Sequence, residues 1–525
     1  MTASQRWIML AAILGSAMVF LDSSVVNLAL PRIGRELSAT YISTLEGQTY
    51  VVSGYLASLA ALLILAGALA DYHGRRRVFA IGLGAFAVTS LLCGLAPNLE
   101  LLVVFRILQG AAGALLVPGS LAILTTTFEG AARARSFGIW AAATSAAGLV
   151  GPVVGGILVD GVSWRMAFLV PFPLLAVALY ATLRHMPESR DESSSGHFDW
   201  LGATVAVIAV GGLAFGAIRG QDRRWADPLA WAALGVGAVA LVAFPILMAR
   251  RPYPLVPLGL FRLRRFATIN LSTLLIYGAL YTMFTVQALF LQGVVGYSAT
   301  AAGLIGVPTG ILLTVLSTRV GALAGRYGAR PFLTIGPLLM AAAQLWLARV
   351  PATTEPWRLA LADPSTFLPP LSTLVDILPY MLLSGVGISL IVAPLTSTLM
   401  SSVPVRNAGI ASAINNAISR IGQPLLSAMI FVLVSGSFYA ALASAVPGLD
   451  ASSPALRAMV QPLNPPGAST PPAIAAAATY ASVDALHLAV IVCAGLLVAG
   501  AAANWFGLRP GVQEASVDAE PAASA

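Results

Sequence analysis

Long runs of apolar residues, separated by short polar segments, follow one another along almost the whole chain. A helix needs about 20 residues to cross the ~30 Å hydrocarbon core of a bilayer, so each run of that length predicts a membrane span. The first run is too long for the apolar region of a signal peptide and lacks a clean cleavage site, so we expect it to be retained. Fourteen spans are predicted, at 7–29, 49–70, 78–96, 101–125, 136–159, 165–183, 200–218, 229–249, 268–291, 301–323, 331–349, 376–400, 408–435 and 484–507.

The polar segments divide the predicted spans into groups of six, two and six. The segment 184–199 is the most polar and predicts a linker, and the segment 250–265 is rich in proline and arginine. This pattern predicts an all-helical membrane protein with two six-helix bundles and two extra central spans. The expected parts are an N-terminal bundle at 1–183, linkers with the two extra helices at 184–265, a C-terminal bundle at 266–510 and a disordered cytoplasmic tail at 511–525.

The distribution of positive charge favours one orientation of these spans. All 29 basic residues are arginine. With the N-terminus in the cytoplasm, the tails and inward loops hold nearly twice as many arginines as the outward loops. Because cytoplasmic loops carry an excess of positive charge, we expect both termini in the cytoplasm. Two outward segments, 350–375 and 436–483, are long, and the second is compatible with disorder or with a small hairpin.

Composition supports a lipid environment and excludes several functions. The chain is 58% hydrophobic and only 10% charged, with a mean hydropathy of +0.86, whereas soluble domains hold about 25% charged residues. The net charge of +8 comes from arginines scattered over short loops, which does not form the basic stripe that nucleic-acid binding requires. The two cysteines, Cys93 and Cys493, lie in apolar segments and form no disulfide framework.

Two charged residues lie deep inside predicted spans. Asp22 is the only carboxylate well inside an apolar run, and Arg106 is the only arginine at that depth in the N-terminal half. An ionisable group in a membrane is costly unless it pairs, faces a cavity or takes up a proton. Burial favours the neutral form of a carboxylate and a nearby cation favours the charged form, so a site that alternates between the two can load and release a proton. A purely structural ion pair is the alternative.

A short polar turn between the second and third predicted spans combines glycines with an acid and a base. Gly67 and Gly74 permit close approach and a tight turn, and Asp71 with Arg75, or with a partner in the other half, would form a cytoplasmic gate. The alternative is a charge cluster that only sets topology. A weaker copy lies at 321–331, where Gly325 replaces the aspartate, so we expect only the first lock to be strong.

The fifth predicted span contains glycines every three or four residues around a proline: Gly148, Gly151, Pro152, Gly155 and Gly156. Glycines at this spacing generally mark close packing of helices. The proline adds a kink because it removes a backbone hydrogen bond.

Together these motifs resemble the major facilitator superfamily, and in particular its 14-span drug:H⁺ antiporters of the EmrB/QacA type. The resemblance covers nearly the whole chain and rests on the turn at 67–78, Arg106-x-x-Gln109-Gly110, the glycine string at 148–156, Asp199-Trp200-x-Gly202 and Asn407-Ala-Gly409-Ile-Ala-Ser412-Ala-Ile-Asn415-Asn416. It implies a proton-coupled exporter in the bacterial inner (cytoplasmic) membrane, in which Asp22 and Arg106 couple protons and the glycine string is the antiporter motif. It also implies that the proton gradient supplies the energy and that no cofactor or metal is needed.

The cargo is expected in a central cavity between the two bundles. Relatives that export dications carry extra acidic residues in the C-terminal spans, whereas here Asp376 and Asp484 lie at span ends and Arg420 lies inside one. That balance disfavours dications and leaves neutral, zwitterionic and anionic cargo open. The candidate cavity residues are Asn27, Gln109, Tyr277, Tyr281, Gln287, Asn415, Asn416 and Arg420.

The sequence separates three candidate functions. The sequence favours a drug:H⁺ antiporter that exports small amphipathic or hydrophobic compounds by alternating access. A dedicated exporter of one endogenous metabolite, such as an antibiotic, siderophore or lipid precursor, is the alternative on the same fold. An enzyme is disfavoured because the four histidines are scattered and no nucleophile–base set is visible. The expected partners are the cargo, protons and membrane lipid, with a periplasmic adaptor as an option and nucleic acid excluded.

Overall fold

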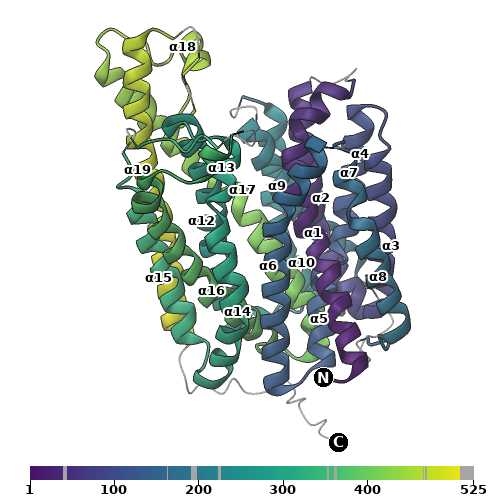
Figure 1. The fold of residues 1–525 in the computed structure, drawn as a ribbon. Helices are drawn as coiled ribbons and strands as arrows, with labels where there is room; N and C mark the ends of the chain where they lie inside the picture. Colours follow the sequence, from purple (N-terminus) through teal and green to yellow (C-terminus); the bar gives the residue numbers. More distant parts are fainter. Residues whose placement is uncertain are drawn as a thin grey trace, which may run out of the picture.

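The computed structural model describes residues 1–38, 44–161, 163–190, 198–222, 226–351, 354–359, 363–464, 466–467 and 470–508. The tail expected to be disordered, 511–525, lies outside these residues. The described chain is helical and contains no strand, apart from one isolated bridge between Ser38 and Asn98. Two groups of long helices stand side by side, and the N-terminus and the last turn of the final helix lie at the same end of the molecule (Figure 1). That end is called the N-terminal face below.

The N-terminal group contains eight helices: α1 (Ala3–Glu36), α2 (Thr44–His73), α3 (Arg75–Gly94), α4 (Leu99–Ala114), α5 (Val117–Thr127), α6 (Gly130–Gly161), α7 (Met166–Leu169) and α8 (Pro171–His185). Two central helices follow, α9 (Trp200–Asp222) and α10 (Pro228–Arg250). The remaining α-helices are α11 (Gly259–Arg262), α12 (Arg264–Phe290), α13 (Ala299–Leu304), α14 (Val307–Tyr327), α15 (Arg330–Leu347), α16 (Leu378–Ser401), α17 (Ala408–Ala445), α18 (Pro454–Met459) and α19 (Pro472–Gly507). Short π-helical turns, η1 (Leu291–Val295) and η3 (Thr373–Ile377), continue α12 and precede α16, and the 3₁₀ turns are η2 (Pro364–Phe367) and η4 (Val405–Asn407).

Twelve helical segments in the described residues are long and apolar enough to cross a membrane. They overlap twelve of the fourteen predicted runs. The other two runs, 136–159 and 331–349, overlap α6 and α15, which are helices of 32 and 18 residues. The chain is therefore a multi-pass membrane protein.

Prolines explain why three predicted spans are each built from two helices. Pro118, Pro171 and Pro308 stand in the first turns of α5, α8 and α14. Proline suits the start of a helix but removes a hydrogen bond from its interior, so the helix stops and restarts at these points. A hydropathy pattern does not register such a break, because the residues on both sides remain apolar.

The long segment 436–483 is largely helical. α17 continues to Ala445 and α19 begins at Pro472, and together with α18 they project beyond the rest of the molecule on the side opposite the N-terminal face (Figure 1). The start of α19 is rich in alanine, the residue with the highest helix propensity. Asp484 therefore lies within this 36-residue helix rather than at its first turn.

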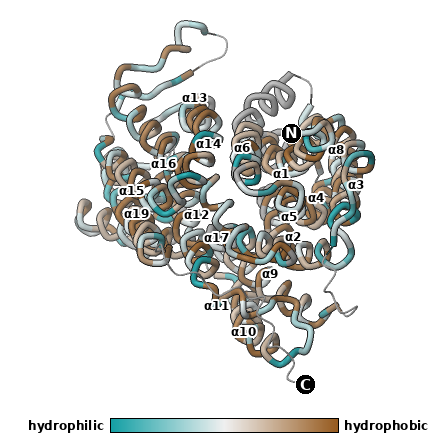
Figure 2. The backbone as a smooth tube through the Cα atoms, turned by 90° about the horizontal axis from the view of Figure 1, so that it is seen from below, coloured by the Kyte–Doolittle hydropathy of each residue, from teal (hydrophilic) through white to brown (hydrophobic). Residues whose placement is uncertain are grey.

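The two halves meet along two seams. On one seam α2 packs against α17, and on the other α6 packs against α14. The inserted helix α9 packs against both α2 and α17, so α9 and α10 lie over the first seam (Figure 2). The second seam has no such cover among the described helices. The boundaries drawn at residues 183 and 265 stay predictions.

Candidate functional site

A buried ion pair links α1 to α4. Arg106 Nη1 donates to Asp22 Oδ2 at 2.6 Å, and both side chains are fully buried. Gln109, one turn further along α4, donates from Nε2 to Asp22 Oδ1 at 3.0 Å. Arg106 also donates to Gln109 Oε1 at 2.7 Å. Both carboxylate oxygens are thus satisfied, as a charged group in an apolar interior requires.

Helix α2 holds the arginine of this pair in place. Arg106 Nε donates to the Val51 carbonyl at 3.0 Å, and its guanidinium lies 4.1 Å from the centre of the Tyr55 ring. The two helices lie so close together that a Cβ at Gly110 would collide with the Tyr55 carbonyl, so the absence of a side chain at Gly110 permits this contact. Removing one partner of a buried pair generally costs about 3–5 kcal/mol, because the other charge is left uncompensated. A proton on Asp22 would therefore leave Arg106 with the oxygens of Gln109 and Val51 but without a compensating negative charge.

The central cavity lies mainly in the C-terminal half and has a volume of about 370 Å³. Six of the predicted cavity residues line it: Tyr277, Tyr281, Gln287, Asn415, Asn416 and Arg420. Gln109 was predicted to line the cavity as well, but it lies in the buried ion-pair network instead. The side chain of Asn27 lies outside the described residues.

Several lining residues were not predicted from the sequence. Phe20, Trp140, Phe284 and Tyr380 belong to four different helices and complete the aromatic wall. The rotation of a helix about its axis decides whether an aromatic residue faces lipid, core or cavity. All three environments accept apolar rings, so the residue type does not distinguish them. Two of these residues have a polar tip with a partner: the Tyr380 hydroxyl donates to Gln287 Oε1 at 2.7 Å, and the Trp140 indole N–H donates to Ser16 Oγ at 3.1 Å.

Some polar groups in the cavity are already used by the fold. Asn415 Nδ2 donates to Asn270 Oδ1 at 3.1 Å and to Thr273 Oγ1 at 2.8 Å, which joins α17 to α12. Asn416 Nδ2 donates to the Ser412 carbonyl one turn earlier, at 2.9 Å. Asn415 thus joins two helices of the C-terminal half, whereas Asn416 bonds within its own helix, so fewer groups remain free to contact cargo.

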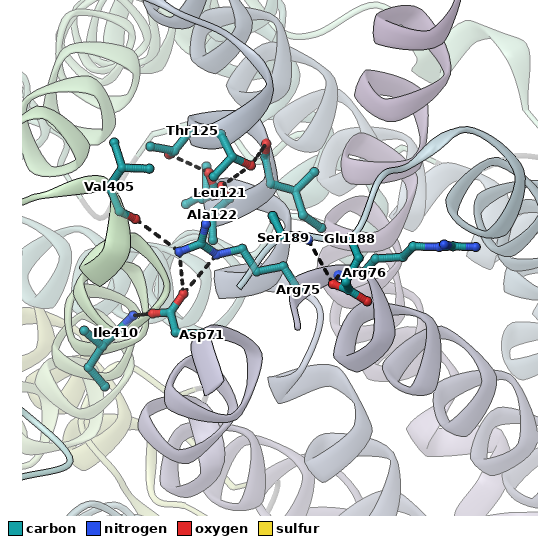
Figure 3. Close-up of polar contacts among 12 residues, drawn as sticks. Asp71, Arg75, Arg76, Leu121, Ala122, Thr125, Glu188, Ser189, Val405 and Ile410 are labelled. Atoms are coloured by element: carbon teal, nitrogen blue, oxygen red, sulfur yellow. Dashed lines mark hydrogen bonds and ion pairs between the residues drawn. The ribbon is translucent and has the colours of Figure 1, made fainter. Parts of the chain in front are cut away.

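A second polar cluster lies at the N-terminal face, where α2 meets α17 (Figure 3). Arg75 donates to Asp71 Oδ1 from Nε at 2.9 Å and from Nη2 at 2.7 Å, and Nη2 also donates to the Val405 carbonyl at 3.1 Å. The other oxygen of Asp71 accepts from the backbone N–H of Ile410 at 3.0 Å. Both Asp71 and Arg75 are buried. The pair therefore bridges the two halves of the molecule.

Asp71 takes the place of an N-cap side chain for α17. Asn407 occupies the N-cap position but makes no side-chain capping bond. The carboxylate of Asp71 supplies that bond from the other half of the chain and also faces the positive end of the helix dipole.

The glycines at this contact allow the helices to touch. A Cβ on Gly67 would lie 2.5 Å from the Ala413 Cβ and 2.6 Å from the Gly409 carbonyl oxygen. A Cβ on Gly409 would lie 2.6 Å from each oxygen of Asp71. Any side chain at either position would push α2 and α17 apart.

The turn after α2 is held by a residue that the sequence did not single out. Gly74 has a φ of +106°, which favours glycine. Glu188 accepts from the backbone N–H groups of Arg76 at 3.0 Å and Arg77 at 3.2 Å, and so caps the start of α3 (Figure 3). Nothing in the spacing of the linker sequence marks Glu188 as this partner.

The glycine string lies in α6. Gly148 lines the central cavity, and a Cβ there would meet no atom within 4 Å. Gly151 is buried. Pro152, Gly155 and Gly156 belong to the helix, but their surroundings lie outside what the structure describes. Among the described residues, no three His, Cys, Asp or Glu side chains are grouped so that they could hold a metal ion.

Comparison with known proteins gives relatives over most of the chain. The family described as Major Facilitator Superfamily matches residues 12–427. The "Multidrug resistance protein Stp" of Mycobacterium tuberculosis (strain CDC 1551 / Oshkosh) is 33% identical over 457 residues, which cover 86% of this chain and 80% of that protein. The "Tetracenomycin C resistance and export protein" of Streptomyces glaucescens is 31% identical over 428 residues, or 81% of this chain and 75% of that protein.

Solved structures share the fold at low identity. The crystal structure of the human organic anion transporter MFSD10 (TETRAN) superposes with a TM-score of 0.58 at 15% identity, and covers 97% of this chain and all of that one. Likeness at this level of identity concerns the architecture alone.

Proposed function

The chain belongs to the major facilitator superfamily, and we propose that it is a fourteen-span, proton-coupled exporter of small amphipathic or hydrophobic compounds. The observation that carries this proposal is the fully buried Asp22–Arg106 pair. It ties α4 to α1, the helix whose Phe20 lines the central cavity, and such helices must move during transport. Two relatives whose names include multidrug resistance and tetracenomycin C resistance and export support the direction and the class of cargo. As a member of a transporter family, the chain is expected to carry out no chemical step on its cargo.

α6 and α15 supply the two spans beyond the twelve candidates. α6 has 32 residues, about 48 Å of helix, and α15 has 18 residues, about 27 Å. Each packs between helices that are themselves candidate spans, α6 against α1 and α14, and α15 against α16 and α19. With fourteen spans, the N-terminal face and both termini lie on the cytoplasmic side of the bacterial inner membrane. This orientation agrees with the arginine distribution.

In the proposed cycle, Asp22 and the cargo act on the same helix. Asp22 lies on α1 inside the N-terminal half, and Phe20, two residues earlier, lines the cavity. A proton on Asp22 weakens its attraction to Arg106, and α1 then shifts against α4. That shift changes the cavity wall at Phe20, so proton binding and cargo binding disfavour each other without direct contact. Downhill proton entry therefore drives cargo out.

The contacts at the N-terminal face belong to a state in which the cytoplasmic side is closed. Asp71 with Arg75 and the Gly67–Gly409 contact join α2 to α17 there. In the proposed cycle, this closure lets cargo leave toward the outside, and its opening admits cargo from the cytoplasm.

The decisive experiment compares wild type with Asp22→Asn in inverted vesicles under an imposed pH gradient, using neutral, cationic and anionic dyes. We expect gradient-driven transport to be lost in Asp22→Asn while the purified protein remains folded and still binds cargo. Asp363→Asn, which neutralises an exposed aspartate near η2, is the matched control and should transport normally. Undiminished gradient-driven transport by Asp22→Asn would disprove the coupling role.

A dedicated exporter of one endogenous compound is the second candidate, because one relative is named for a single antibiotic. In that case the dye panel would give no transport with correctly folded protein. A compound made by the producing cell would then restore gradient-driven, Asp22-dependent transport.

A further inference from the structure

Among the described residues that line the central cavity, one side chain is charged. Arg420, from α17, lines the cavity together with Tyr277, Tyr281 and Phe284 of α12. No Asp or Glu lines the cavity among the described residues. The space therefore carries a net positive charge inside a low-dielectric membrane protein, where a charge acts more strongly than in water.

Arg420 differs from the two buried arginines described above. Arg106 is paired with Asp22, and Arg75 is paired with Asp71. Within the described part of the chain, Arg420 forms neither an ion pair with a carboxylate nor a hydrogen bond, and its guanidinium lies 5.8 Å from the centre of the Phe20 ring. An arginine held in a membrane without a partner is costly and is expected to face a ligand or a water-filled space.

The wall beside Arg420 is suited to an aromatic body. The ring centres of Tyr277 and Tyr281 are 5.9 Å apart, and those of Tyr281 and Phe284 are 6.4 Å apart. These residues are spaced by four and three positions on α12, so they form a continuous stripe on one face of the helix. Flat rings can pack along such a stripe while a charged group reaches the guanidinium.

We propose that this cavity selects aromatic compounds that carry one anionic group, a carboxylate or a sulfonate, and that Arg420 is the residue that determines this selectivity. The inference rests on the proposed export function and names the substrate class of the same cavity. A planar, two-oxygen anion matches the fork of N–H donors on a guanidinium. A cationic compound would meet the unpaired charge of Arg420 and be disfavoured.

The position of Arg420 also places the anion between the two halves. Arg420 belongs to α17 of the C-terminal half, whereas Phe20 belongs to α1, the helix that carries Asp22.

The proposed substrate class also sets the charge that moves in each transport cycle. Export of one anion is electrically equivalent to moving one positive charge inward, and entry of one proton moves a second. Transport of the anion by a one-proton cycle is therefore electrogenic, and a potential that is negative inside the cell accelerates it.

A matched pair of probes tests this selectivity directly. Dansylic acid and dansylamide share one fluorescent ring system. The first is a sulfonate anion at neutral pH, and the second is a neutral sulfonamide. Their binding to the purified full-length protein in nanodiscs is measured by fluorescence titration. We expect wild type to bind the sulfonate about ten- to a hundredfold more tightly than the amide, the range typical of hydrogen bonds to charged groups.

Variants then assign the preference to one side chain. Arg420→Gln should reduce the preference to less than about threefold, and Arg420→Lys should retain part of it, since a lysine offers charge without the fork. Arg326→Gln, which removes an exposed arginine at the end of α14, is the matched control and should bind as wild type does. A monodisperse elution profile for each variant establishes that it is folded.

The outcomes separate this inference from the proposed function. Equal binding of the two probes, no detectable binding of the sulfonate, or an unchanged preference in Arg420→Gln would each overturn the anion selectivity, even if gradient-driven transport of other dyes is intact. An Arg420-dependent preference without any gradient-driven transport would uphold the selectivity and refute the proton-coupled export.

Discussion

The turn between α2 and α3 and the turn between α14 and α15 share one sequence pattern, 254 positions apart, but differ in their contacts. In both turns a glycine has positive φ, +106° at Gly74 and +84° at Gly328, so the backbone reverses in a similar way. In the first turn Asp71 and Arg75 are buried together against α17. The similarity lies in the backbone, and the difference lies in the charged side chains.

The second turn has lost both members of the ion pair. Gly325 stands where the first copy has Asp71, and Ala329 stands where it has Arg75. Two bases remain in this turn. Arg326 is exposed, whereas Arg330 donates from Nε to the Trp505 carbonyl at 2.9 Å, and its guanidinium lies 3.9 Å from the Trp505 ring centre. It thus contacts α19 of its own half and does not reach across to the N-terminal half.

The seam beside the second turn is closed by packing. A Cβ on Gly138 of α6 would lie 3.1 Å from the Thr318 Cα of α14. No ion pair between α6 and α14 is present among the described residues. Close helix contact is common to both seams, whereas among the described residues a charged lock is present at only one. The free energy that favours closure of the N-terminal face should therefore depend far more on the first turn.

The largest effect is expected from breaking the glycine contact at the first turn. In Gly67→Val, even the new Cβ would overlap Ala413 and the Gly409 carbonyl, and neither is a flexible side-chain tip. Overpacking costs about 1–3 kcal/mol or more, and a Cβ this close to a backbone carbonyl belongs at the upper end of that range. The closed state should therefore become more than about a hundredfold less populated, and gradient-driven transport should fall in parallel.

The reporter for this prediction is a spin-label distance between exposed positions 77 and 401, which lie in different halves at the N-terminal face. The distance should lengthen in Gly67→Val. Gly84→Val is the control, because a Cβ on Gly84 would meet no atom within 4 Å. A wild-type distance in Gly67→Val would show that α2 and α17 do not form the gate.

A smaller effect is expected from removing the charge while keeping the shape. Asp71→Asn retains an acceptor for the Ile410 N–H but loses the charge that attracts Arg75 and the start of α17. Hydrogen bonds to charged groups contribute about 1.5–3 kcal/mol, so the open state should gain about ten- to a hundredfold in population, measured with the same label pair. In a double-mutant cycle with Arg75→Gln, the second substitution should add little once the first is present. Fully additive effects would mean that the two side chains act independently.

The sequence predicted most spans and the deep ion pair for a simple physical reason. A run of about 20 apolar residues has few alternatives to crossing a membrane. A lone carboxylate inside such a run, Asp22, requires a partner. With one arginine at the same depth in that half, Arg106, the pairing followed from elimination of other candidates.

The partners of the gate and the cavity wall were harder to predict. Asp71 bonds to a backbone N–H 339 positions away, and no side-chain type reveals such a partner. Gln109 is expected in the cavity because the family motif that it matches lines the cavity, but its amide donates to Asp22. Trp140 and Tyr380 were missed because lipid-facing and cavity-facing positions are both apolar, so helix rotation is not recorded in hydropathy.

The smallest effect is expected from rebuilding a lock at the second turn. Gly325 is exposed on α14 and does not have a positive φ, so an aspartate is accommodated there. By analogy with Asp71, a carboxylate in Gly325→Asp would face the start of α6 across the second seam. A negative charge near a helix N-terminus contributes about 0.3–1 kcal/mol, which predicts a closed state favoured about two- to fivefold and slower turnover under saturating cargo.

A sharper test asks whether the new carboxylate restores closure in a variant that has lost the first lock. Because closure is shared by both seams, Gly325→Asp should partly restore the label distance in the Asp71→Asn background, and adding Ala329→Arg should restore it further. Gly325→Asn adds similar bulk without charge and should give no rescue. If Gly325→Asp and Gly325→Asn rescue equally, the gain comes from packing, and the difference between the two turns is one of shape rather than charge.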